Sequence, residues 1–393
     1  MPRGAISSGV SGRFSVAGLG VTQQGRNLGI APRELRRQSL DLALDDAGLT
    51  RQQVDGYIGT SSEMFDDVKY LGLSPKFAYT MQAGGASSIL SIINAMGAIA
   101  IGQADVVACV FGSAPTAGLL KRADGSMGGY GNFGYGYGRM YGLVGAGGAH
   151  AFHARRHMHR YGTTSRQLGA VAVVQRDHAS VRPGTLGYGQ PITIDDHQAS
   201  RIVVDPLRLL DCCRDTDGGV AVLVTTTERA RDLPGWHVTV LGAGTGNNLR
   251  NWWTGEAFDQ HDDIATAMAT AFGQAGIGLA DIDVAALYDP FTISVIMQLE
   301  AFGFCGPGEG GAFVESGATR VGGAIPTNTS GGQLSGWYAT GFTAVTEGLR
   351  QLRGEGEATQ VAGAEVALVT GHGGNAGVQN TWSHATMLLG VDR

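Results

Sequence analysis

Apolar residues fall into short runs that end at glycines, a pattern that predicts alternating strands and helices. The apolar run at residues 14–20 is typical of a buried strand that ends at a glycine. Residues 32–47 place leucines along one side of a helix, and Gly48 follows as its C-terminal stop. The next expected elements are a strand at 55–59, an apolar helix at 89–101 and a strand at 106–111. This alternation is typical of an α/β fold.

The same order returns in the second half of the chain. Four pairs of segments correspond: residues 14–20 with 237–241, 40–47 with 264–275, 89–101 with 342–352, and 106–111 with 366–370. Two copies of one strand–helix order predict two doubly wound halves related by a pseudo-twofold axis. A chance similarity between unrelated βα units is the alternative.

A long segment separates the two copies and defines the predicted domain organisation. Residues 1–112 and 202–235 form an N-terminal half, 113–201 an inserted loop domain, and 236–393 a C-terminal half. Within the insertion, glycine alternates with aromatic residues over 128–138. This composition suits either a loop that covers a large ligand or an ordinary flexible connection.

Four histidines follow within the insertion: His150, His153, His157 and His159. Their spacing can bring some of them together on one helix face, but no carboxylate or cysteine stands at ligand spacing among them. We therefore expect a polar helix face and no metal site.

The overall composition narrows the class of protein. With 393 residues, 43% of them hydrophobic, the chain can form a large core, whereas its net charge of −6 argues against nucleic-acid binding. The longest apolar run, residues 89–101, is shorter than the ~20 residues of a membrane span. No signal peptide is visible, and the four cysteines form no CxxC pair. These features predict a cytoplasmic protein with reduced thiols.

Residues 329–341 form a glycine-rich loop that leads into the helix expected at 342–352. Glycines let backbone N–H groups approach a ligand closely, and a helix start offers partial positive charge to an oxyanion. Tyr338 lies where the loop is expected to become the helix. This placement predicts that the loop forms the centre of the functional site.

Several specific motifs surround this loop. They are Asn328-Thr329-Ser330-Gly331-Gly332, Leu287-Tyr288-Asp289, Gln298-Leu299-Glu300 and Pro206-Leu207-Arg208-Leu209-Leu210-Asp211-Cys212-Cys213. Together they resemble the thiolase superfamily of the sterol-carrier or lipid-transfer type, over essentially the whole chain. Within it, they are most similar to the aldolases that cleave steroid side chains as CoA thioesters. The resemblance implies a thiolase fold with five αβαβα layers.

The chain departs from ordinary thiolases at their catalytic positions. In that family a nucleophilic cysteine begins the first apolar helix, yet no cysteine stands near Gly84 and Gly85. Tyr338 replaces the histidine of the second-half motif, and Tyr288 replaces the leading His or Asn of a third motif. Because an acyl-enzyme requires an activated nucleophile, ordinary thiolysis is not expected.

The resemblance and the two tyrosines imply a retro-aldol reaction. The expected activity is cleavage of a β-hydroxyacyl-CoA with a steroid-like acyl group to a ketone and a short acyl-CoA such as propionyl-CoA. Tyr288 and Tyr338 would act as base for the hydroxyl and as acid or donor for the enolate, in an order that the sequence leaves open. Two buried tyrosines that only form hydrogen bonds are the alternative.

Further residues are candidates for the same site. His372 is a third catalytic candidate, with packing of its loop as the alternative. Asp289 is expected to orient its neighbours rather than to titrate. Candidates for binding the substrate or an oxyanion are Gly84, Gly85, Asp289, Asn328, Gly331, Gly332, Gly371 and Gly373. The trio Asp195-Asp196-His197 is expected to be structural, with a position that faces CoA as the alternative.

No cofactor or metal is expected in this chain, because the thioester itself stabilises the enolate. The resemblance implies a homodimer that binds two copies of a DUF35-type partner, with a zinc ribbon and an OB-fold, as a heterotetramer. Any zinc would then lie in the partner. Two other functions stay open: a non-catalytic carrier of acyl-CoA or lipid, and a thiolase-like acyltransferase.

Overall fold

The computed structural model describes residues 10–60, 64–116, 145–248, 261–373 and 383–391. One mixed sheet runs through these residues. Its strands are β1 (Phe14–Val21), β2 (Gly56–Gly59), β3 (Phe77–Thr80), β4 (Val107–Ser113), β7 (Gly218–Thr226), β8 (Val238–Asn247), β9 (Val284–Ala286), β10 (Val366–Gly373) and β11 (Ser383–Val391). Their order across the sheet is β3-β2-β4-β7-β1-β8-β11-β10-β9. The sheet is mixed because β2 runs parallel to β3 and β4, and β9 parallel to β10, whereas the remaining pairs are antiparallel.

The sheet divides at its centre into two halves of the same construction. β1 and β8 meet there as antiparallel neighbours, with Ser15 opposite Thr239 and Val16 opposite Val238. The first half contains β1, α1 (Pro32–Ala47), β2, α3 (Ser87–Ala100), β4 and β7 in chain order. The second contains β8, α9 (Asp262–Ala275), β9, α12 (Phe342–Leu352), β10 and β11. The predicted repeat is confirmed.

Equivalent residues form the same contacts in the two halves. Gly48 and Gly276 follow α1 and α9 with left-handed backbones, at φ of 65° and 69°. Asp55 accepts two backbone N–H groups just before β4, at 2.8 and 3.0 Å. Asp283 accepts two at the start of β10, at 2.8 and 2.9 Å. Agreement at this level of detail argues against a chance similarity of βα units.

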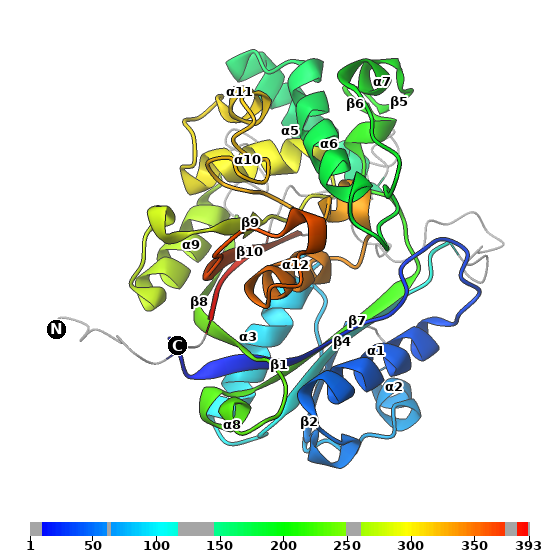
Figure 1. Cartoon of the computed structure of the whole chain (residues 1–393), viewed down its shortest axis with the longest axis vertical. Coiled ribbons are helices and arrows are strands. Elements are labelled where there is room, and N and C mark those ends of the chain that lie inside the picture. The colour runs from blue at the N-terminus through cyan, green and yellow to red at the C-terminus, as the bar shows by residue number, and fades with distance from the viewer. Residues whose placement is uncertain (1–9, 61–63, 117–144, 249–260, 374–382, 392–393) are drawn as a thin grey trace.

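Helices and sheet halves alternate in five layers (Figure 1). α1 covers the outer face of the first half, in a core that includes Leu40 and Leu223. α3 and α12 lie between the inner faces of the two halves, where Ile92 and Phe342 are buried. α9 and α10 (Thr292–Phe302) cover the outer face of the second half. Two short helices complete the first half: α2 (Met64–Tyr70) beside α1, and α8 (Thr227–Arg231) beside β1.

The described part of the insertion packs on the second half. It contains α5 (Gly145–Tyr161), α6 (Ser165–Ser180) and α7 (Ile194–Ala199), and α6 lies against α10 and α11 (Gly310–Glu315). Ala154 of α5 and Leu168 of α6 belong to the same apolar core as α9 and α10. β5 (Ile202–Val204) and β6 (Leu207–Arg208) then pair, and β7 returns to the first half between β4 and β1. Residues 128–138 lie outside the described residues.

The polar helix face expected for the α5 histidines lies mostly inside the protein. The side chains of His150, His153 and His157 are buried, and His159 is exposed. His157 contacts Glu300 of α10 through Nε2, at 3.0 Å from Oε2. His150 instead contacts the Ala146 carbonyl of its own helix and the Phe291 ring, so periodicity within α5 alone could not indicate these partners.

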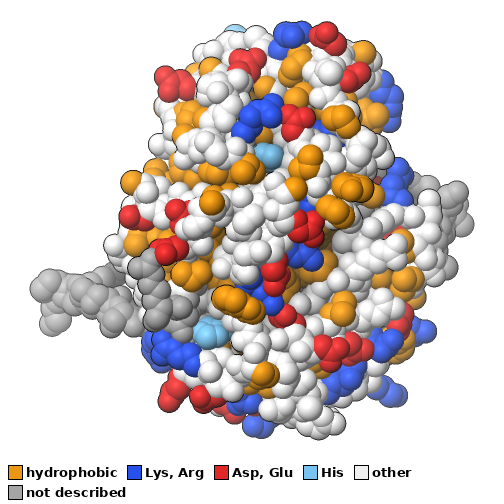
Figure 2. Space-filling model, viewed as in Figure 1, with side chains coloured by type: hydrophobic (Ala, Val, Ile, Leu, Met, Phe, Trp, Pro, Cys, Tyr) orange, Lys and Arg blue, Asp and Glu red, His pale blue; other side chains and the backbone are white. Residues whose placement is uncertain are grey.

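The visible surface carries charges of both signs. Figure 2 shows basic and acidic side chains interspersed on this face, with small apolar areas between them. Among the described residues, none of the helices has the length and apolar character needed to cross a membrane.

Candidate active site

Four segments of the chain meet at Gly85, just before α3. A Cβ atom built on Gly85 would lie 2.0 Å from Cζ of Tyr288, which follows β9. A Cβ on Gly341, just before α12, would lie 2.2 Å from the carbonyl oxygen of Gly85. Those on Gly371 and Gly373, in β10, would lie 2.7 and 2.4 Å from Gly85 backbone atoms. The starts of both central helices and the ends of two strands therefore converge on one small volume.

This packing leaves no room for a nucleophile at the position that the thiolase resemblance implies. The ring of Tyr288 fills the space that a side chain at Gly85 would enter. All four cysteines are free, and burial raises the pKa of each thiol, to about 12 for Cys212 and Cys305. Because a nucleophilic cysteine needs a readily formed thiolate, none of these thiols suits acyl transfer.

Tyr288 is held by its backbone as well as by its ring contact. Its N–H donates to Oγ1 of Thr370 in β10 at 2.8 Å, and its carbonyl accepts from Nε2 of Gln298 in α10 at 2.7 Å. The Thr370 hydroxyl donates in turn to Oε1 of Gln298 at 2.6 Å. Tyr288 is buried, so a strand and a helix together fix its direction toward Gly85.

Tyr338 does not lie at the start of α12, as the sequence suggested. A π-helical turn, Gly332–Gly336, precedes it, and α12 begins four residues after it at Phe342. The left-handed backbone of Thr340, with φ of 50°, delays the helix. The partial positive charge at a helix start acts only within about one turn. The expected stabilisation of a Tyr338 phenolate by the start of α12 is therefore not supported by this position.

Two backbone N–H groups of the glycine-rich loop are directed at Asp289 rather than left open to a ligand. Gln333 and Leu334 donate their backbone N–H groups to the Asp289 carboxylate at 3.0 and 3.3 Å. Gly332, in the left-handed region at φ of 57°, lies against the same carboxylate. Burial raises the pKa of Asp289 to about 7. Asp289 thus links the segment after β9, which carries Tyr288, to the glycine-rich loop that carries Tyr338. An ionised Asp289 carboxylate would also repel an oxyanion bound at this place.

Asn328 fixes the end of β9. Its side-chain Oδ1 accepts the backbone N–H of Leu287 at 2.7 Å, and its backbone N–H donates to the carbonyl of Ala285 at 2.9 Å. Gly331 donates its N–H to the carbonyl of Asn328 at 2.8 Å, so this N–H is also used within the loop. The Nδ2 group of Asn328 is buried and has no hydrogen-bond partner among the described residues.

The ring of His372 lies on the other face of the sheet. Residues alternate between faces along a strand, and its neighbours Gly371 and Gly373 face Gly85. The Nδ1 atom of His372 lies 3.0 Å from Nδ1 of His384 and 3.7 Å from Oδ2 of Asp263 in α9. Burial, and then His384, lower the pKa of His372 well below its ordinary value. The structure therefore brings Gly84, Gly85, Gly371, Gly373 and Tyr288 together but separates the His372 ring from them.

Sequence reasoning missed the side chains that hold the tyrosines. Thr370 and Gln298 hold Tyr288, and the buried Thr216 Oγ1 accepts the N–H of Tyr338 at 2.6 Å. Gln298 stands in a motif that carried the family resemblance, which is the one signal that could have suggested it. Thr216 and Thr370 carry no comparable signal.

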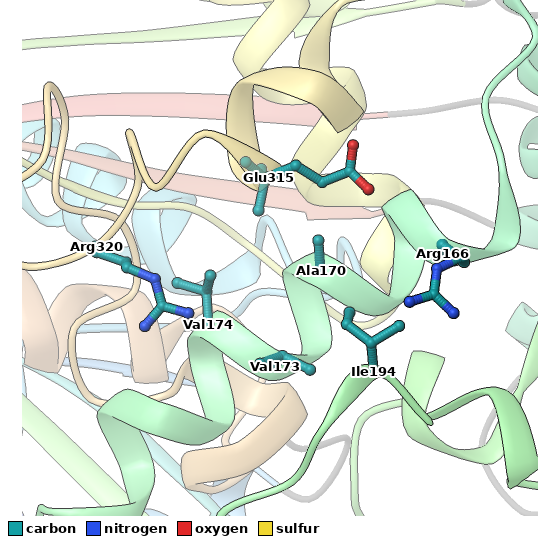
Figure 3. A pocket seen from close by; sticks show the side chains of 8 residues that line it. Arg166, Ala170, Val173, Val174, Ile194, Glu315 and Arg320 are labelled. Atoms are coloured by element: carbon teal, nitrogen blue, oxygen red, sulfur yellow. The ribbon is translucent and has the colours of Figure 1, made fainter. Parts of the chain in front are cut away.

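A pocket elsewhere on the surface does not belong to this site. It has a volume of about 180 Å³ and lies between α6 and the region of α11 (Figure 3). Its two cations already have partners, because Arg320 pairs with Asp177 at 2.8 Å and Arg166 with Asp195 at 3.5 Å. None of its lining residues comes from the loops that carry Tyr288 and Tyr338.

Comparison with known proteins identifies the family. The 17-hydroxy-3-oxo-4-pregnene-20-carboxyl-CoA lyase of Mycobacterium tuberculosis is 38% identical over 380 residues, covering 92% of this chain and 96% of the relative. The steroid side-chain-cleaving aldolase of Thermomonospora curvata is 35% identical over 364 residues, covering 87% and 91%. This chain belongs to the steroid side-chain-cleaving aldolase family.

The fold of these aldolases agrees with the architecture seen here. The solved structure of an Ltp2-ChsH2(DUF35) aldolase superposes with a TM-score of 0.87 at 33% identity, covering 98% of this chain and 99% of the other. Residues 256–390 match the family described as thiolase C-terminal domain-like. The resemblance drawn from the motifs and the thiolase-like α/β fold are both confirmed, and the chain is a lyase of the thiolase superfamily.

Proposed function

We propose that this aldolase cleaves a β-hydroxyacyl-CoA with a steroid-like acyl group into a ketone and a short acyl-CoA such as propionyl-CoA. One observation carries the proposal: the Tyr288 ring occupies the space of a thiolase nucleophile, and the loop of Tyr338 contacts the same glycine. The names of the relatives, a carboxyl-CoA lyase and a steroid side-chain-cleaving aldolase, support the substrate class.

The two tyrosines would divide the proton transfers of a retro-aldol step. One phenolate takes the proton of the β-hydroxyl, and the C–O bond becomes a carbonyl as the Cα–Cβ bond breaks. The electron pair passes to the thioester as an enolate, and the other phenol donates a proton to Cα. Atoms and electrons balance without water, free CoA or a redox partner. We assign this pair of roles to Tyr288 and Tyr338 jointly.

The predicted binding residues support the thioester in this proposal. Gly84, Gly85, Gly371 and Gly373 pack backbone against backbone beside the Tyr288 ring, and the thioester would bind next to this cluster. The buried Nδ2 group of Asn328 is a candidate donor to a polar atom of the substrate or to a bound water. His372 would act only through its backbone, since its ring faces α9.

A partner chain is part of the proposal. The Ltp2-ChsH2(DUF35) aldolase contains a DUF35 partner, as its name states. We propose that this chain likewise forms a homodimer that binds two DUF35-type chains, with any zinc in the partner and no cofactor in this chain. Size-exclusion chromatography with light scattering would test the assembly, and a mass that corresponds to the homodimer alone would exclude the heterotetramer.

Mass spectrometry tests the activity itself. The protein, alone and with a candidate DUF35 partner, is mixed with a steroid β-hydroxyacyl-CoA in the absence of free CoA. Release of a ketosteroid and a short acyl-CoA is the expected result. Products that form only with added CoA would indicate thiolytic acyl transfer, and binding without turnover would indicate a carrier.

A further inference from the structure

Tyr338 lies in a segment that has little regular structure of its own. The turn Gly332–Gly336 ends before it, and Phe342 begins α12 after it. Trp337 is extended and Thr340 is left-handed, so the chain changes direction on both sides of the tyrosine. Thr343 of α12 holds the two neighbours of Tyr338, because its hydroxyl accepts the Ala339 N–H at 3.0 Å and donates to the Trp337 carbonyl at 3.2 Å. The backbone of Tyr338 itself is held from elsewhere in the fold.

One buried side chain holds both backbone polar groups of Tyr338. Oγ1 of Thr216 accepts the Tyr338 N–H at 2.6 Å and donates its own proton to the Tyr338 carbonyl at 2.9 Å. Thr216 is 1% exposed, so water cannot take over these bonds without a change in packing. A hydroxyl is both donor and acceptor, so serine could form the same two bonds, whereas the similarly shaped valine could form neither.

The segment just before β7, residues 213–217, joins both tyrosine loops to the first half of the fold. The N–H of Cys213 donates to the carbonyl of Pro290 at 2.9 Å, two residues after Tyr288. At the other end of the segment, the carboxylate of Asp217 accepts two backbone N–H groups of the first half, at 2.8 and 3.1 Å. The segment is thus anchored at one end and contacts both loops along its length.

The backbone of Tyr288 is held in a similar way. Its N–H donates to the hydroxyl of Thr370, just as that of Tyr338 donates to the hydroxyl of Thr216. Both threonines are buried, and neither belongs to the loop that it holds: Thr370 lies in β10 and Thr216 just before β7. Two separate hydroxyls therefore set the backbone positions of the two tyrosines.

We propose that Thr216 is a positioning residue of the aldolase: its hydroxyl fixes the backbone of Tyr338 and so the distance of that phenol from Tyr288. The inference rests on the proposed role of Tyr338 in the retro-aldol step. A misplacement of about 1 Å lowers the rate of an oriented reaction by roughly 10²-fold. Thr216→Val should therefore lower kcat by about 10²-fold with KM changed less than about threefold, and Thr216→Ser should keep most of the activity.

The test compares these two variants with Thr225→Val, each in the full-length chain. Thr225 is also buried and donates to the carbonyl of Asp105 at 2.7 Å, but it lies at the opposite end of β7 from Thr216. Thermal unfolding of each variant is recorded beside kcat and KM. A selective loss of kcat in Thr216→Val, with recovery in Thr216→Ser, supports the proposal. Full activity in Thr216→Val, or an equal loss in Thr225→Val, overturns it.

A readout without turnover separates this proposal from the proposed function. A 3-fluorotyrosine incorporated at position 338 reports the ring environment by ¹⁹F NMR. Thr216→Val should shift or broaden its signal, and Thr216→Ser should leave the signal in place. If Tyr338→Phe keeps full activity, the catalytic role of Tyr338 fails, while the ¹⁹F signal still shows whether Thr216 sets the ring position. An unchanged signal in Thr216→Val overturns the positioning role whatever the activity of Tyr338→Phe.

Discussion

The ring of Tyr288 occupies the space that any side chain at Gly85 would need, because a Cβ there would lie 2.0 Å from Cζ of the tyrosine. The same Cβ would also lie 2.5 Å from the carbonyl oxygen of His372, which belongs to the backbone of β10 and cannot move independently. A nucleophile at position 85 and a tyrosine at position 288 therefore exclude each other.

Gly85→Ala should disable the enzyme without unfolding it. The added methyl group forces the Tyr288 ring or the β10 backbone to move, so we expect kcat to fall by at least about 10²-fold and stability by ~1–3 kcal/mol. Gly97→Ala is the matched control, because a Cβ at Gly97 in α3 meets nothing within 4 Å. Product release by mass spectrometry and thermal unfolding check both variants. A fully active Gly85→Ala enzyme would contradict this packing.

Removal of either hydroxyl should stop turnover. Tyr288→Phe and Tyr338→Phe keep the ring and its contacts but remove the transferred proton, so each should lower kcat by about 10²–10⁴-fold. Tyr188→Phe, at an exposed position, is the control and should be fully active. The assay is ketosteroid formation in the absence of free CoA. Full activity in one variant would remove that tyrosine from the proton transfers.

Local signals in the sequence were enough for most of the framework. The helix expected at residues 32–47 is α1, Pro32–Ala47, and the helix expected at 342–352 is α12, Phe342–Leu352. In α1 the leucine stripe predicts the helix, and Gly48 directly after it predicts where the helix ends, so both signals lie within the segment itself. The repeat was visible for the same reason, because each half carries its own set of such signals.

The arrangement of the site depended on contacts that no local pattern contains. Thr216 and Tyr338 are 122 residues apart, and Asp289 and Gln333 are 44 apart. The expected helix start at Tyr338 was wrong because the chain forms a π-helical turn and a left-handed residue there instead. The direction of His372 could have been predicted, since strand alternation places it opposite its two neighbouring glycines.

A buried ion pair that includes Glu347 of α12 contacts the glycine-rich loop, residues 329–341. Arg182 Nη1 lies 2.8 Å from Oε1 of Glu347, and both side chains are 3% exposed. The hydroxyl of Thr329, next to Asn328, also donates to Glu347. Arg182→Met should cost ~3–5 kcal/mol because it leaves a buried carboxylate without its partner, and the double variant with Glu347→Met should recover much of that loss. Urea unfolding of both variants checks this, and strictly additive losses would contradict it.

Buried histidines of α5, β10 and β11 should make the free energy of unfolding depend on pH. Burial lowers the pKa of His150 to about 4 and that of His384 to about 3, and it lowers those of His153 and His372 well below the ordinary value. A histidine with a lower pKa in the folded state binds fewer protons when folded, so the free energy of unfolding rises with pH. Asp263 and Asp289 act in the opposite sense, because burial raises the pKa of each to about 7 and their protonation favours the folded chain.

We expect the histidines to outweigh Asp263 and Asp289, so that the protein is most stable near pH 7.5 and loses stability as the pH falls from 6.5 toward 4. At pH 5 each strongly shifted histidine removes up to ~2 kcal/mol relative to pH 7.5, and Asp263 and Asp289 together offset about two of them. Urea unfolding between pH 5 and 7.5 measures the slope. His384→Gln should flatten it, whereas His159→Gln, at an exposed position of α5, should leave it unchanged. A free energy of unfolding that increases on acidification would mean that the two buried carboxyls, Asp263 and Asp289, dominate.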